Sequence, residues 1–458
     1  MCSVQDEDGD IAVPRSAISA DRVCMKCKDT KAVVVTRVND ALCRDCFIVY
    51  VVHKFRATIG KSHLIRDGEE ILLAFSGGPC SSALLHLVQE GLSQRAHKRL
   101  RFKPSLVHID EMGVLDLPSE EREKTNAAIL DVLRGTGYPC YISSLEQALD
   151  LPDGSGEQKV GHCRPPCWNI DNGEGLENYN RAKHDKRLAD VFKSIKSTTA
   201  KENYVRNLRN QLLTAIARRH SYSKVMLANT STRLAIRILS DIGQGRGGQV
   251  SVDTCFADER HGDIMFVRPI REVTSKEVAM YNSLYRVEPV FVPTLTTQAS
   301  RGASIDHLTE CFVTGLQAEF PSTVSNITRT AGKLDSVVRT GTEDFCVLCQ
   351  SPLDTNVGEA SALRAVEFSD MLSKRGCDPG STTSGCCGEG DGSCQSSKVN
   401  SLHNTDVIKA LCYGCRLTVK DMTDVSQLPS HVTQEAASRI SRLRMKEDIQ
   451  DFLIDGDS

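Results

Sequence analysis

An apolar run at 71–75, Ile-Leu-Leu-Ala-Phe, passes directly into Ser-Gly-Gly-Pro-Cys-Ser at 76–81 and then into an apolar segment with helical spacing at 82–88. This order predicts a buried strand, a tight turn and a helix. Two glycines in the turn let the backbone approach a ligand closely. The helix N-terminus adds N–H donors and partial positive charge, which favour an anion. The sequence therefore predicts a phosphate-binding loop, with nucleotide contacts from Ser76, Gly77, Gly78 and Ser81.

Strands and helices are expected to alternate beyond this loop, which predicts an α/β fold with a parallel sheet covered by helices on both faces. The ligand site of such a sheet lies at the carboxyl ends of its strands. The expected strands are 71–75, 105–109, 139–143, 224–228, 250–254 and 264–268. The expected helices are 47–59, 81–90, 119–134, 202–219 and 231–241, and one that opens with the capping box at 274–277.

Eight of the 19 cysteines fall in four Cys-x-x-Cys pairs, a spacing typical of zinc tetrads in a reducing compartment. The first two pairs have 15 residues between them, and the last two are separated by a long segment that loop-closure entropy tolerates. We expect two structural zinc sites, although the thiolates of the second tetrad would also accept iron. The predicted ligands are Cys24, Cys27, Cys43 and Cys46, and then Cys346, Cys349, Cys412 and Cys415.

The remaining motifs are weaker. Cys377, Cys386, Cys387 and Cys394 fall in the Gly/Ser-rich stretch 376–400, which is expected to be disordered, so we take them as non-ligands. Cys163 and Cys167 lie in an irregular segment and have no defined role. The glycine-rich run at 243–248 follows an expected helix and precedes an expected strand, which is the wrong order for a phosphate cradle; a flexible loop is predicted there.

Composition excludes several classes of protein. With 40% hydrophobic and 25% charged residues in 458, the chain resembles an ordinary globular protein. A formal net charge of −3 gives no global basic field, so nucleic acid would need a local patch. The start is acidic and no apolar run reaches bilayer length, which argues against a signal peptide or membrane span and favours the cytosol.

Local basic clusters are the candidate RNA contacts, because Lys and Arg neutralise phosphates. The densest run is 95–103, and smaller clusters surround residues 54–56 and 218–220. A solvated helix end or loop would explain these runs equally well. The residues singled out for tRNA contact are Lys54, Arg56, Lys98, Arg99 and Arg101.

The motif at 76–78 resembles that of the pyrophosphate-loop ATPases, Ser-Gly-Gly-x-Asp-Ser, which adenylate a carbonyl oxygen for displacement by sulfur or nitrogen. More narrowly, the chain is similar to the cytosolic tRNA 2-thiolation proteins and, among them, to the non-catalytic second subunit. The similarity rests on the zinc pairs and on short motifs along nearly the whole chain: 53–56, 73–78, 99–102, 108–111 and 449–453.

The resemblance implies five regions. These are a flexible N-terminus (1–20), a zinc ribbon (21–60), a degenerate pyrophosphate-loop domain of the adenine nucleotide alpha hydrolase type (61–340), a C-terminal four-cysteine zinc element with the 376–400 insert (341–430) and a charged helix (431–458).

Several catalytic features of the family are missing. Cys80 stands where the motif's Asp would help to hold Mg²⁺, so ATP and Mg²⁺ binding is doubtful. Glu202 and Val205 take the places of two catalytic cysteines, and no cysteine occurs near Arg268, where a third would fall. Cys80 could itself be a reactive thiol at a helix N-terminus, but a small residue filling a vacated site is the preferred interpretation.

The resemblance implies an auxiliary subunit that supports tRNA binding while a catalytic partner 2-thiolates wobble uridine (U34). Sulfur would come from the thiocarboxylate of a ubiquitin-related modifier protein. Two alternatives stay open. The chain could adenylate tRNA by itself with Asp110 or Glu111 as an unusual metal ligand, or it could be a zinc-bearing interaction module that touches neither ATP nor RNA.

Overall fold

The structure is a computed structural model that describes residues 22–36, 40–96, 99–115, 117–151, 168–169, 181–300, 302–334, 345–353, 404–422 and 427–449. The expectations for residues 1–20, for the 376–400 insert, for Cys163 and Cys167 and for the end of the last helix beyond 449 lie outside these ranges. Within the described part of the chain, no helix combines the length and the hydropathy that a bilayer span requires.

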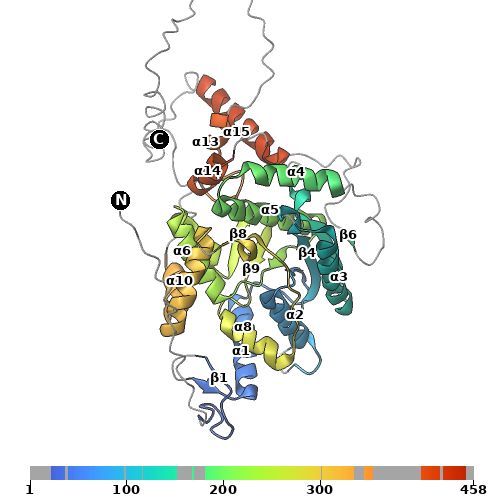
Figure 1. The fold of residues 1–458 in the computed structure, drawn as a ribbon, viewed down its shortest axis with the longest axis vertical. Coiled ribbons are helices and arrows are strands. Elements are labelled where there is room, and N and C mark those ends of the chain that lie inside the picture. The colour runs from blue at the N-terminus through green and yellow to red at the C-terminus, as the bar shows by residue number, and fades with distance from the viewer. Residues whose placement is uncertain are drawn as a thin grey trace, which may run out of the picture.

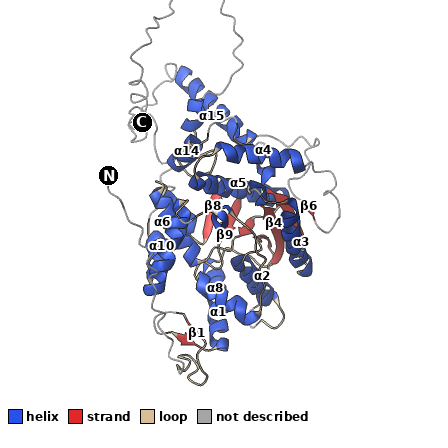
Figure 2. Ribbon diagram, viewed as in Figure 1, coloured by secondary structure: helices blue, strands red, loops and turns tan. Residues whose placement is uncertain are grey.

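A seven-stranded sheet runs through the centre of the molecule in the order β6-β5-β4-β3-β7-β9-β8 (Figures 1 and 2). Its five inner strands are parallel, as predicted, and both edge strands are antiparallel to their neighbours. The strands are β3 (Glu70–Ala74), β4 (Lys103–Asp110), β5 (Cys140–Ser144), β6 (Trp168–Asn169), β7 (Lys224–Met226), β8 (Ala257–His261) and β9 (Ile264–Val267).

Helices cover both faces of this sheet because successive strand residues point to opposite sides. On β3, Ile71 and Leu73 join one core cluster and Leu72 joins the other. The first cluster packs against α1 (Arg44–Ser62), α2 (Pro79–Leu92), α3 (Ser119–Gly135) and α8 (Ser275–Tyr285). The second packs against α4 (Arg181–Ser194), α5 (Thr198–Arg219) and the 3₁₀ turn η2 (Leu145–Asp150).

Further helices extend the molecule on two sides (Figure 1). α6 (Ser231–Gly243) packs against α10 (Ile305–Glu319) and α11 (Thr323–Ala331). Beside α5 lie α13 (Asn404–Lys409), α14 (Tyr413–Lys420) and α15 (Ser430–Ile449). The short helix α9 (Leu295–Gln298) also contacts α5, and 3₁₀ turns occur at η1 (Met112–Val114) and η5 (Gly247–Gln249). At the N-terminal end, β1 (Val34–Val35) and β2 (Ala41–Leu42) form a small antiparallel pair.

One predicted strand is wrong. Residues 250–254 form a short helix, α7 (Val250–Thr254), and the strand that follows is β8. The β-branched residues at 250, 252 and 254 suggested a strand, but α7 packs its Val250 against α6 and α11 side chains. Tertiary packing has therefore overridden the local β-propensity.

Candidate functional site

The predicted phosphate loop connects β3 to α2. In the sheet, β4 lies on one side of β3 and β7 on the other, so the strand order changes direction at β3. Gly77 adopts a positive φ of 81°, and Gly78 is the N-cap of α2. Within the turn, the Ser81 hydroxyl donates to Gly78 O (2.9 Å) and the Ser76 hydroxyl donates to Ser81 Oγ (3.2 Å). The four predicted residues therefore form one turn at the carboxyl edge of the sheet, the place where α/β folds bind ligands.

Two features depart from a good pyrophosphate cradle. Pro79 is the first residue of α2 and has no N–H to offer an anion. Cys80, at the following position, is half-buried against Thr230 and Arg233 of the α6 N-terminus, and its burial raises the pKa of the thiol despite the nearby guanidinium. A raised pKa favours the neutral thiol, which agrees with the interpretation of Cys80 as a space-filling residue.

Two acidic residues lie at the carboxyl end of β4, Asp110 as its last residue and Glu111 directly after it, and arginines pair with both. Asp110 accepts hydrogen bonds from Arg122 Nε (2.9 Å) and Asn126 Nδ2 (2.9 Å). Although burial opposes ionisation, Arg122 holds the pKa of Asp110 below its usual value. Glu111 pairs with Arg209 of α5, with 2.7 Å between Nη2 and Oε2. These contacts use carboxylate oxygens that a metal-binding role would need.

The three positions expected to have lost catalytic cysteines hold residues with structural contacts. Val205 is buried in the core on α5. Burial raises the pKa of Glu202, whose Oε1 accepts a hydrogen bond from the Thr296 hydroxyl (2.9 Å). Arg268 is fully buried and donates to Asp258 Oδ2 (3.2 Å) and to Cys255 O (3.0 Å).

Several of the predicted tRNA contacts have partners within the described part of the chain. Lys54 donates to both carboxylate oxygens of Glu277, at 2.9 and 3.0 Å. Arg101 pairs with Asp67 (3.2 Å), and Arg99 is exposed and donates to Leu92 O (2.8 Å). Arg56 is half-buried, and Lys98 lies outside the described residues.

The first cysteine tetrad comes together beside the β1–β2 pair. The sulfur atoms of Cys24, Cys27, Cys43 and Cys46 all lie within 4.8 Å of one another. The Cys27–Cys43 separation is 3.8 Å. Tetrahedral Zn–S bonds of about 2.3 Å put the sulfur atoms about 3.8 Å apart, so the geometry fits a metal. Cys27 is exposed, whereas Cys24 and Cys43 are buried.

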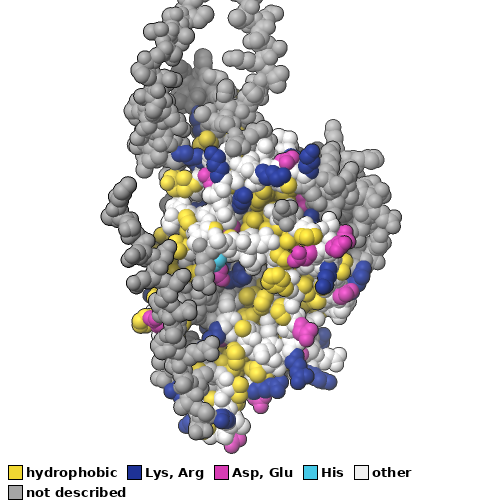
Figure 3. All heavy atoms as spheres, in the orientation of Figure 1, with side chains coloured by type: hydrophobic (Ala, Val, Ile, Leu, Met, Phe, Trp, Pro, Cys, Tyr) yellow, Lys and Arg dark blue, Asp and Glu magenta, His cyan; other side chains and the backbone are white. Residues whose placement is uncertain are grey.

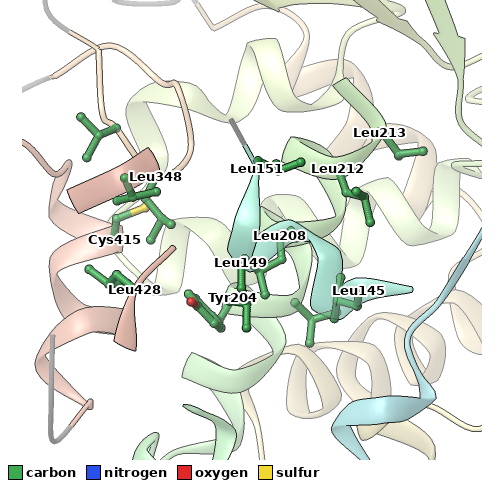
Figure 4. Close-up of a cluster of buried hydrophobic side chains, with 14 of the residues drawn as sticks. Leu145, Leu149, Leu151, Tyr204, Leu208, Leu212, Leu213, Leu348, Cys415 and Leu428 are labelled. Atoms are coloured by element: carbon green, nitrogen blue, oxygen red, sulfur yellow. The ribbon is translucent and has the colours of Figure 1, made fainter. Parts of the chain in front are cut away.

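The second tetrad also comes together, but inside the main core. Cys346, Cys349, Cys412 and Cys415 have sulfur atoms within 4.8 Å of one another, with 3.6 Å between Cys349 and Cys412. Figure 4 shows Cys415 and Leu348 in the same cluster as α5 side chains. Asn207 Nδ2 donates to Cys415 Sγ (3.9 Å), and Gln211 Nε2 donates to Leu348 O (2.8 Å). Both tetrads are therefore compatible with a structural metal.

Two buried arginines near the second tetrad were not predicted from the sequence. Burial alone would lower the pKa of Arg246, but the Cys415 sulfur and Asp241 raise this pKa above its usual value. Arg260 pairs with Asp253 and Asp258, and its Nη1 donates to Ser351 Oγ (2.7 Å). Their guanidinium groups lie close enough to the tetrad to balance part of the charge that four thiolates would carry.

The glycine-rich run at 243–248 contains Arg246 and packs against this tetrad. A Cβ atom at Gly414 would lie 2.3 Å from Arg246 Nε, and one at Gly245, where φ is 72°, would lie 2.5 Å from Tyr413. The flexible loop expected here is instead a packed turn. The sequence Gly-Arg-Gly at 245–247 could have indicated this packed turn, because glycine permits close approach of the backbone as well as flexibility.

Comparison with known proteins gives consistent matches. The family described as Cytoplasmic tRNA 2-thiolation protein 2 matches residues 304–417. Cytoplasmic tRNA 2-thiolation protein 2-A of Xenopus laevis is 41% identical over 96% of this chain and 96% of its own length. Cytoplasmic tRNA 2-thiolation protein 2 of Homo sapiens is 36% identical over 99% of this chain and 98% of its own.

Among solved structures, the U34-tRNA thiolase NcsA from Methanococcus maripaludis, with its [4Fe-4S] cluster, is similar over 69% of this chain and 86% of that one. The TM-score is 0.48 and the sequence identity is 13%.

Proposed function

The chain belongs to the cytoplasmic tRNA 2-thiolation protein 2 family, and from this premise we propose that it is the non-catalytic subunit of a complex that 2-thiolates U34 of cytosolic tRNAs. A catalytic partner would adenylate the C2 oxygen of the uridine, and the thiocarboxylate sulfur of a ubiquitin-related modifier protein would displace AMP from C2. Water would then cleave the acyl C–S bond, which leaves the sulfur on the uridine and a carboxylate on the modifier protein. This chain would stabilise the partner and help to bind tRNA. The name that its relatives share places them in the cytoplasm, and we assign the chain to the same compartment.

The observation that carries the non-catalytic role is the state of the carboxyl edge of the sheet. The turn at 76–81 keeps the shape of a phosphate loop, but a neutral Cys80 and a donor-free Pro79 occupy two of its positions. Asp110 and Glu111, the carboxylates at the carboxyl end of β4, are paired with arginines. Ser76, Gly77, Gly78 and Ser81 would then retain at most weak nucleotide binding without Mg²⁺.

We assign structural zinc to both tetrads. The sulfur separations of 3.8 Å and 3.6 Å fit tetrahedral Zn–S coordination. With the first tetrad, residues 21–60 would form a zinc ribbon ahead of the α/β domain at 61–340, and the second tetrad would anchor the C-terminal element at 341–430. Metal analysis of the purified full chain tests this, with two zinc per chain expected.

The functional test combines the full chain with its co-purified partner, ATP, tRNA and a thiocarboxylate donor. We expect 2-thiouridine to form only with both subunits, and Cys80→Ala to leave the rate unchanged because the thiol has no chemical role. Release of pyrophosphate by the isolated chain with tRNA would contradict the proposal and favour a self-sufficient enzyme. Partner activity and tRNA affinity that do not change when this chain is added would favour an interaction module.

A further inference from the structure

Phe291 is the most exposed of the large hydrophobic side chains described, with 75% of its surface accessible. It lies in the extended segment after α8, which crosses the phosphate loop. On one side of Phe291, Val290 N–H donates to Gly77 O (2.9 Å), and on the other Val292 packs against Gly77. Because side chains alternate along an extended segment, these contacts turn Phe291 away from the loop and into solvent.

Two exposed cations lie at the same edge of the sheet. Arg233 is in the first turn of α6, against Cys80, and Lys276 is in the first turn of α8. The two turns are joined, since Thr230 and Ser275 hydroxyls are 3.0 Å apart and Ser275 N–H donates to Thr232 Oγ1 (3.1 Å). Both cations are exposed, and neither forms an ion pair with any carboxylate in the described ranges.

An exposed aromatic ring at the same edge of the sheet as two exposed cations has the chemistry of a single-stranded RNA contact. Unpaired bases stack on aromatic side chains, and Lys and Arg neutralise the flanking phosphates. The segment that carries Phe291 is fixed to the loop through Gly77, so the ring is held in place without losing exposure. Hydrophobic side chains gather over α2 and α8 on the face seen in Figure 3, with Lys and Arg at their margin.

We infer that Phe291 stacks on an unpaired tRNA base while Arg233 and Lys276 hold its neighbouring phosphates. This inference rests on the proposed role in tRNA thiolation and adds the place of contact. It differs from the basic clusters predicted from the sequence, where Lys54 and Arg101 are engaged by carboxylates. Phosphate contacts of this kind supply affinity, and the stacked base fixes where along the strand the protein sits.

The test measures the Kd of the full chain, with its co-purified partner, for end-labelled cytosolic tRNA. Phe291→Ala should raise the Kd about tenfold, the range that loss of one base–aromatic stack gives, and Phe291→Trp should retain affinity. Phe320→Ala is the matched control, because Phe320 is 60% exposed at the end of α10. Arg233→Gln and Lys276→Gln should each reduce the slope of log Kd against log salt by about one.

An unchanged Kd for Phe291→Ala would overturn the inference, as would loss of the co-purified partner, which would make Phe291 a protein contact. Displacement of tRNA by ATP at its own binding concentration would assign the ring to a free nucleotide instead. If the wild-type complex binds tRNA no better than the partner alone, the proposed function itself fails. If the wild type contributes to binding and the variants match it, only the present inference fails.

Discussion

The two cysteine tetrads share a motif but occupy different surroundings. The first joins parts of the chain close in sequence, beside a two-stranded pair, and Cys27 is exposed. The second joins residues far apart in sequence and lies against α5, in the same cluster as strand residues such as Leu72 and Val225. The same set of four cysteines therefore joins nearby residues of a small local unit in the first case and distant segments of the central core in the second.

The largest difference should appear when one ligand is removed from each tetrad. Cys415→Ala should lower the free energy of unfolding by more than about 4 kcal/mol, because loss of the metal leaves the three other cysteines without their shared ligand beside α5. Cys27→Ala should leave the main transition in place and unfold only the segment around β1 and β2. Urea unfolding and metal content of the full chain measure both. Equal losses from the two variants would remove the distinction between the tetrads.

The second-largest loss of stability is expected when an arginine beside the second tetrad is replaced. Arg260→Met removes one arginine from each of the buried Asp253 and Asp258, which keep Arg237 and Arg268, and should cost about 1.5–3 kcal/mol. Arg218→Met is the matched control, since its pair with Asp263 is exposed and worth less than about 1 kcal/mol. Thermal unfolding at neutral pH compares the two variants, and similar losses would show that burial of the pair is unimportant.

The same variant has a defined pH dependence. Although burial opposes it, Arg260 holds the pKa of Asp258 below its usual value, so this carboxylate stabilises the fold above its unfolded pKa of about 3.9. That contribution is lost as pH falls through the lower, folded pKa. In Arg260→Met the folded pKa rises, and acid unfolding should begin at a higher pH than in the wild type. An unshifted acid midpoint would contradict this account.

A chelator should distinguish the tetrads by the rate at which each releases its metal. The site with the exposed Cys27 should release a bound metal through local opening, while the second tetrad should release its metal more slowly because the core must open first. Release followed with a colorimetric metal indicator should therefore have two phases of equal amplitude. Hydrogen exchange should rise first in residues 22–36. A single phase would mean that both sites open together.

The smallest effect is expected at Glu202, on the same helix as the contacts to the second tetrad. Burial raises the pKa of this carboxyl above its unfolded value, so its contribution to stability is greatest at low pH and falls as pH rises through the folded pKa. Glu202→Gln should therefore stabilise the protein at neutral pH and not at pH 4. Unfolding curves at the two pH values test the sign.

Much of the sheet could be predicted because its strands carry continuous apolar runs, as at 71–75 and 105–109. The starts of helices that carry capping residues could be predicted equally well, and the predicted capping box of Thr274 and Glu277 is present. The sequence could not reveal that 250–254 is helical, because its β-branched residues fit either state until α6 and α11 pack against them. The β8 strand was missed because it is short and charged.

The candidate site was predictable where chemistry depends on spacing. The Cys-x-x-Cys pairs assembled as expected, and the turn at 76–81 has the predicted form. Contacts between distant residues were not predictable: Lys54 meets Glu277 across 223 positions. Phe291 likewise reads as an ordinary apolar residue until the backbone contacts on either side show which way its ring must face.

The separation between the halves of the second tetrad also bears on how the protein is made. Cys349 and Cys412 are 63 positions apart, and the strands they pack beside are all synthesised earlier. During synthesis on the ribosome the sheet and α5 can therefore fold before the C-terminal segment is made. The apolar surface of α5 that this segment covers stays exposed until residue 415 leaves the ribosome. A metal bound by this tetrad, as proposed, would thus be captured among the last events of biosynthesis. The supply of metal at that moment would then decide between a closed core and a chain open to chaperones and proteases.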